Sequence, residues 1–184
     1  STQPVEPIVM PTDIENHWGK EYIIQAMEKG IFNGYGDGTF KPDKEISRLE
    51  VTSIISRTFD LKPSTNTLPF KDLGDAYAPM VEELKSVYSA GIVLGDGTGN
   101  FKPHNIITRE EIALMLMRAF ETLSDIPYEP SELAPFEDTS KLSVESQRAI
   151  SFLYEKNAVN LAKNFDPKRG LTRAEAAKIF NSLK

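Results

Sequence analysis

Three arginines occupy equivalent places in the chain and are the side chains best suited to chemistry. Arg48, Arg109 and Arg173 each stand second in a four-residue motif, whose copies are Ser47-Arg48-Leu49-Glu50, Thr108-Arg109-Glu110-Glu111 and Thr172-Arg173-Ala174-Glu175. Each motif follows a Phe-x-Pro and begins an apolar run with helical spacing. A guanidinium presents a planar fork of N–H donors that matches a carboxylate or a phosphate. The repeated arginine therefore predicts recognition of an anionic group.

The other motif residues have a structural explanation. Ser or Thr followed three residues later by Glu is a capping box, and losing such a cap costs about 0.5–2 kcal/mol. We therefore expect the three Ser/Thr–Glu pairs to act mainly as caps: Ser47/Glu50, Thr108/Glu111 and Thr172/Glu175. Capping does not require the arginine, which falls at the first helical position, where the helix dipole disfavours a cation. A helix N-terminus with free amides is itself an anion site, and the arginine would strengthen it.

An aspartate that opens each unit offers a structural alternative for the arginines. Asp13, Asp72 and Asp138 precede the motifs at nearly constant distance. An ion pair between each arginine and the aspartate of its own unit would explain the repetition without any ligand. The residues alone leave both interpretations open, and the aspartate can also orient the arginine toward a ligand.

Two aromatic residues are further candidates for ligand binding. Trp18 and Tyr77 occupy the fifth position after the opening aspartate, where the third unit has Ser143. An aromatic ring there can stack on a sugar, but the sequence favours core packing for both side chains.

The remaining sequence gives little sign of other chemistry. The chain has no cysteine, and its two histidines, His17 and His104, lack ligand-like spacing. The Gly-Asp-Gly loops of the first two units resemble calcium loops but lack the D-x-D-x-D-G series and its closing glutamate. No nucleophile or phosphate-loop motif is present. We therefore expect no metal, no cofactor and no catalytic residue, so the chain is predicted not to be an enzyme.

Composition excludes two classes of partner. The formal net charge is −6 and the 21 Lys and Arg residues are scattered, which argues against nucleic acid. No stretch approaches the roughly 18–20 apolar residues that a membrane span needs, so we expect no membrane insertion. The amino terminus is not a charged-then-apolar leader, so either the protein is intracellular or its signal peptide lies outside this sequence.

The chain reads as three repeats of a helix–loop–helix unit. After the motifs, the apolar stripes align at helical spacing, as do those of the first helix in each unit, which Gly30, Gly91 and Asn157 terminate. One such unit can hardly bury two helices alone, so the three must pack together. We predict an all-α domain with pseudo-threefold symmetry. Its predicted parts are a lead-in at 1–12 and units at 13–61, 69–123 and 135–184.

These features together resemble the S-layer homology domain, a family that occurs as three tandem copies. The matching residues are Phe70-Lys71-Asp72, Phe136-Glu137-Asp138, His17-Trp18, Lys29-Gly30-Ile31, the run from Gly36 to Pro42, and the Thr172 motif. The resemblance implies a three-pronged domain around a central three-helix bundle, with grooves between units. It implies non-covalent anchoring of an extracellular surface protein to secondary cell-wall polysaccharide, typically through pyruvylated N-acetylmannosamine. In that family the motif arginines and glutamates form the anion site.

Departures from the family pattern make the three grooves unequal. The third unit lacks the tryptophan and the Gly-Asp-Gly loop, the second has Glu110 where the family has alanine, and the first has Ser47 and Leu49. We expect one or two working sites in a monomer. The alternative function is a structural or protein–protein assembly module that binds no glycan.

Overall fold

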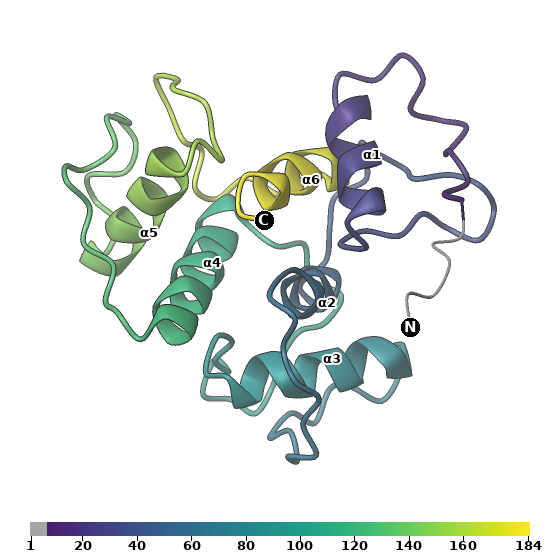
Figure 1. Ribbon diagram of the computed structural model, residues 1–184. Helices are drawn as coiled ribbons and strands as arrows, with labels where there is room; N and C mark the ends of the chain where they lie inside the picture. The colour runs from purple at the N-terminus through teal and green to yellow at the C-terminus, as the bar shows by residue number, and fades with distance from the viewer. Residues whose placement is uncertain (1–6) are drawn as a thin grey trace.

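Six α-helices make up the protein in the computed structural model, which describes residues 7–184 (Figure 1). They are α1 (Lys20–Glu28), α2 (Arg48–Thr58), α3 (Ala78–Ser89), α4 (Arg109–Ser124), α5 (Val144–Glu155) and α6 (Arg173–Asn181). Within residues 7–184 the only extended pairing is three isolated β-bridges. The all-α prediction and its three pairs of helices are confirmed, while residues 1–6 of the predicted lead-in lie outside the described part. No helix in the described range is long and apolar enough to cross a bilayer.

The helices pack across the boundaries of the repeats. The second helix of one unit contacts the first helix of the next, which gives the pairs α2–α3 and α4–α5. The third pair, α6–α1, joins the end of the chain to its beginning, and Figure 1 shows the three pairs spreading from a common centre. Each unit therefore depends on its neighbours for its packing. The pseudo-threefold symmetry of the arrangement stays a prediction.

A closed ring of backbone hydrogen bonds forms the centre. The Ile46 N–H donates to the Leu171 carbonyl (2.8 Å), Leu171 donates to Ile107 (3.2 Å), and Ile107 donates to Ile46 (3.0 Å). All three side chains are fully buried. The family resemblance implied a central bundle of helices. The three bonds join residues that lie directly before α2, α4 and α6, so the first turns of these helices meet at the centre, and the bundle itself stays a prediction.

The opening aspartates hold the Phe-x-Pro loops. Both carboxylate oxygens of Asp13 accept backbone N–H groups, from Phe40 (2.9 Å) and Lys41 (2.8 Å). Lys41 has a φ of 56°, a conformation that is unfavourable for a residue with a side chain. The same clamp recurs where Asp72 binds Phe101 and Lys102, and where Asp138 binds Phe165 and Asp166. The repeated aspartate is thus explained by a strained turn that needs two acceptors.

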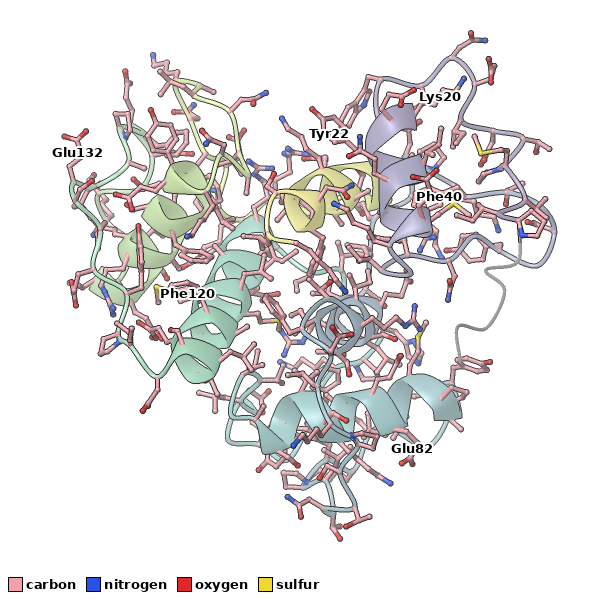
Figure 2. All side chains as sticks on the ribbon, in the orientation of Figure 1. Lys20, Tyr22, Phe40, Glu82, Phe120 and Glu132 are labelled. Atoms are coloured by element: carbon pink, nitrogen blue, oxygen red, sulfur yellow. The ribbon has the colours of Figure 1, made fainter. Side chains whose placement is uncertain are left out.

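The local predictions for the helices hold closely. The Phe120 side chain of α4 points toward α5, and its ring lies 5.4 Å from the ring of Phe152 on that helix (Figure 2). Gly30, Gly91 and Asn157 adopt the left-handed conformation predicted for helix ends, with φ of 68°, 74° and 56°. The predicted capping boxes are complete at Thr108 and Thr172. Ser47 accepts the Glu50 N–H, but no return bond from the Glu50 side chain to the Ser47 N–H is formed, so the third box is half made.

Candidate functional site

Each motif arginine reaches into the neighbouring unit. Arg109 donates from Nε to the Phe165 carbonyl (2.7 Å) and from Nη1 to Glu175 Oε2 (3.1 Å), and its guanidinium carbon lies 4.7 Å from the centre of the Phe165 ring. The equivalent contacts are Arg48 with Phe101 and Glu111, and Arg173 with Phe40 and Glu50. The arginine and the glutamate of the motif thus meet, but they come from different copies of it.

This pairing corrects the structural alternative that the sequence left open. The ion pair of an arginine with the aspartate of its own unit is wrong, because Asp13, Asp72 and Asp138 bind backbone amides instead. Burial raises the pKa of Asp13 and of Asp72, but the backbone N–H bonds outweigh it, and both pKa values lie below the ordinary value. None of the three aspartates lines the grooves described below. Their predicted part in ligand binding stays a prediction.

The amides at the helix N-termini are not free. In α2 the Arg48 N–H donates to the Asn105 carbonyl (2.9 Å), Leu49 donates to Pro103 (3.1 Å), and Glu50 donates to Ser47 Oγ (3.2 Å). The first turns of α4 and α6 are occupied in the same way. The expectation of an anion site made of open helix amides is therefore wrong. Any anion must be bound by side chains.

The three arginines differ in their last nitrogen. Arg173 donates from Nη2 to the Asn33 carbonyl (2.9 Å), so every nitrogen of its guanidinium is bonded, and its side chain is only 7% exposed. For Arg48 and Arg109, no hydrogen-bond partner of Nη2 is found among residues 7–184. Two of the three arginines therefore keep a guanidinium nitrogen without a protein partner in the described residues.

One cavity is lined by one of these two arginines and by the single tryptophan of the sequence. This cavity of about 510 Å³, here the Trp18 groove, takes residues from all three units. Its lining includes Trp18 and Asp43 of the first unit, Arg109 of the second, and residues 158–160, Arg169, Glu175 and Lys178 of the third. The Trp18 side chain is exposed (58%), so the predicted core packing of Trp18 is wrong. The buried side of this segment consists of Gly19, just before α1, and of Ile23 and Ala26 on the helix. Trp18 is not part of that side.

The Trp18 groove is rich in cations. Arg169 binds both oxygens of Glu175 (3.0 and 2.8 Å), so this carboxylate is shared between Arg169 and Arg109. Burial raises the pKa of Glu175, but the bonds and charges of the two arginines outweigh it and hold that pKa below its usual value. Burial and the charge of Arg169 lower the pKa of Arg109. Within the described residues, the half-buried Lys178 makes no ion pair. The free donors here are thus Arg109 Nη2 and Lys178 Nζ.

Sequence reasoning missed Arg169 and Lys178. Arg169 lies three residues before Thr172, and the same position holds Lys44 in the first unit and Asn105 in the second. Alignment of the three units would have shown a basic residue there in two of them. Lys178 lies six residues after Thr172, and the same position holds Ser53 in the first unit and Leu114 in the second. Nothing in the repeats therefore pointed to it.

A second groove surrounds Tyr77. This Tyr77 groove, a cavity of about 410 Å³, is lined by Arg173, Glu50, Tyr35, Lys44 and His104 among others. The Tyr77 side chain is 66% exposed, so its predicted core packing is also wrong. Lys44 donates to the Tyr35 hydroxyl (3.0 Å), and this bond raises the pKa of Lys44. The groove has an exposed aromatic ring, but each guanidinium nitrogen of its arginine already has a protein partner.

The third groove is small. This Arg48 groove, about 220 Å³, is lined by Arg48, Glu111 and Phe101, and no exposed aromatic ring is among its lining residues. Glu110, the acidic substitution in the second motif, does not line the Arg48 groove and makes no ion pair with Arg109 among the described residues. Glu110 binds the Ser146 hydroxyl (2.7 Å) and the Lys168 ammonium instead. The expected inequality of the grooves is therefore seen in their geometry.

Comparison with known proteins yields one family. The family model described as the S-layer homology domain matches residues 12–52, 69–113 and 135–177. An endoglucanase of Bacillus sp. (strain KSM-635) is 34% identical over 169 residues, which cover 90% of this chain and 18% of that protein. An amylopullulanase of Thermoanaerobacterium thermosulfurigenes is 35% identical over 175 residues, 93% of this chain and 9% of that protein. The S-layer protein sap of Bacillus anthracis is 29% identical over 167 residues, 90% of this chain and 20% of that protein. The chain thus spans a fifth or less of each of these relatives.

Proposed function

The chain belongs to the S-layer homology domain family, and from this premise we propose that it is a non-catalytic module that anchors a protein to the cell surface. The segment that it matches is common to an S-layer protein and to two polysaccharide hydrolases, and it is a small part of each. Anchoring is a function that such different proteins can share, whereas hydrolysis is not. The ligand that we propose is an acidic saccharide of secondary cell-wall polysaccharide, ending in a pyruvylated N-acetylmannosamine-type residue.

The observation that carries this proposal is the Trp18 groove. An exposed indole offers a flat apolar surface to a sugar ring, and two donors without protein partners, Arg109 Nη2 and Lys178 Nζ, lie along the same cavity. A pyruvyl ketal supplies a carboxylate fixed to a sugar ring. A charge-assisted bond from a half-buried guanidinium to such a carboxylate is stronger than a bond between neutral groups.

The other two grooves are weaker candidates. In the Tyr77 groove each guanidinium nitrogen of Arg173 already has a protein partner and the side chain is only 7% exposed, so this arginine is less available to an acidic sugar than Arg109. The Arg48 groove keeps a donor but has less than half the volume of the Trp18 groove and no exposed ring. We therefore place the acidic saccharide in the Trp18 groove.

One observation favours the structural alternative. The three arginine–glutamate pairs link each unit to the next in a closed cycle, with Arg173 fully bonded inside the protein. Such a cycle stabilises the fold whether or not a ligand binds. The two functions are separable, because Trp18 and Lys178 take no part in it.

The test uses substitutions that leave this cycle intact. Trp18→Ala and Lys178→Gln change exposed or half-buried side chains of the Trp18 groove, and Tyr77→Ala is the matched control in the other groove. Binding is measured by retention on purified cell wall and by calorimetry with native and with chemically de-pyruvylated polysaccharide. We expect both groove variants to lose at least tenfold in affinity, about 1.4 kcal/mol, with an unchanged melting temperature. Equal binding of the native and de-pyruvylated polysaccharides, or full retention of both variants, would refute the proposal.

A further inference from the structure

We propose that His17 is a positioning residue for Trp18, and thereby for the saccharide site, so the inference rests on the proposed function. The imidazole is mostly buried, with 12% of the side chain exposed. Its Nδ1 accepts the Gly19 N–H (3.0 Å), and its Nε2 lies 2.9 Å from Asp43 Oδ1. Since Nδ1 is an acceptor, the ring proton is on Nε2, which donates to Asp43. One side chain thus binds the residue after Trp18 and a second residue of the groove lining, Asp43.

The bond to Gly19 closes a loop around the backbone of Trp18. The residues on both sides of the tryptophan are fixed relative to each other, which leaves the indole to move only about its own side-chain bonds. Additional turns brace the segment, because the His17 N–H donates to the Ile14 carbonyl (3.0 Å) and its own carbonyl accepts the Lys20 N–H (3.1 Å). No other side chain caps the start of α1. His17 therefore supplies the local order that a capping residue usually gives.

The loop is also fixed against α6, whose residues Glu175, Lys178 and Ile179 line the groove. A Cβ built on Gly19 would lie 3.0 Å from the Ala174 Cβ, which is closer than almost all Cβ contacts in proteins. The backbone at Gly19 is therefore packed tightly against the first turn of α6. Ala174 follows Arg173 in the third motif, and Glu175 comes next. The backbone that carries Trp18 is thereby fixed against the helix that carries Glu175, and both residues line the same groove. Asp43 lines the same groove.

The second unit provides an internal comparison. Ala76 precedes Tyr77 where His17 precedes Trp18. A histidine–aspartate pair exists there too, but His104 follows the Phe-x-Pro and binds Asp75 (3.2 Å) with 62% of its side chain exposed. Among residues 7–184, its imidazole makes no hydrogen bond to the backbone beside Tyr77. The fixed aromatic ring is thus a property of the groove that also has the free cationic donors.

The experiment exploits the single tryptophan of the chain. Fluorescence anisotropy and acrylamide quenching of the ligand-free protein report the order of Trp18, and calorimetry with native wall polysaccharide reports affinity. His17→Ala is compared with His17→Asn, whose side-chain oxygen can accept the N–H two residues on. His104→Ala is the matched control. Melting temperatures verify that each variant folds.

We expect His17→Ala to lower the anisotropy, to raise quenching and to weaken binding about threefold to tenfold, as loss of one positioning hydrogen bond does. His17→Asn restores most of the order and affinity, and His104→Ala changes neither. Unchanged anisotropy in His17→Ala, or an asparagine variant no better than the alanine variant, would overturn the proposal. If wild-type protein binds no polysaccharide while anisotropy still depends on His17, the proposed function fails and the positioning of Trp18 stands.

Discussion

Arg173 and Arg48 occupy the same place in two copies of one motif, yet their replacement should have different consequences for stability. The change is to methionine in each case, which keeps an apolar stem and removes the charge. Arg173 is 7% exposed, binds Glu50 at 3.1 Å and donates to two backbone carbonyls. Arg48 is 16% exposed, and its partner Glu111 lies at 3.5 Å with 41% of its side chain exposed.

The magnitudes follow from what each change leaves behind. Without Arg173, the mostly buried Glu50 carboxylate loses its cation, and the buried Phe40 carbonyl and the partly buried Asn33 carbonyl lose a donor. Breaking a buried ion pair costs about 3–5 kcal/mol, and the partial exposure of Glu50 (18%) places the expectation near the lower end, about 3 kcal/mol. Without Arg48, water solvates Glu111, so the expected cost is about 1 kcal/mol.

Urea unfolding followed by circular dichroism measures the free energy of unfolding of both variants, and thermal unfolding measures their melting temperatures. For a domain of this size each kcal/mol lowers the melting temperature by about 2–4 °C, so Arg173→Met should melt about 6–12 °C below wild type and Arg48→Met about 2–4 °C below. A double-mutant cycle with Glu50→Ala isolates the pair and should return a coupling of about 1–3 kcal/mol. Equal destabilisation by the two arginine variants would contradict the reasoning, because it would mean that exposure and bonding of the guanidinium do not decide its contribution.

Two further predictions concern acid and the closure of the chain. The pKa values of Asp13, Asp72 and Glu175 are lower in the folded protein than in the unfolded chain, so their contribution to the free energy of unfolding is present above about pH 4.5 and is lost as the pH falls through the lowered values. Urea titrations between pH 3 and 7 should show this loss, and Glu175→Gln should reduce its slope. Deletion of residues 135–184 removes α6 from α1 and Leu171 from the central ring. The shortened chain should lose its cooperative thermal transition, and a sharp transition like that of the full chain would contradict the closed arrangement.

The sequence alone determined what depends on near neighbours along the chain. The apolar stripes gave the helices, because burial of one face repeats at helical spacing. Gly30, Gly91 and Asn157 marked helix ends, since those positions need a left-handed backbone. The Ser/Thr–Glu spacing located the caps, because both bonds of a capping box lie within one turn. The order of these landmarks gave the three repeats and the candidate arginines.

Only the tertiary structure decided which copies meet. Arg109 could pair with an acid of its own unit or of another, and the three motifs are too similar in chemistry for spacing to choose between them. The closed ring through Leu171 brings Glu175 to Arg109, and carbonyls in and after the Phe-x-Pro segments of neighbouring units fill the helix amides that sequence reasoning had left open for an anion. The exposure of Trp18 was decided in the same way, because the packing of α1 on α6 selects which face of the segment is buried. Capping and helical spacing act through contacts a few residues apart, whereas the groove combines residues of three units that are far apart in the sequence and that only the fold brings together.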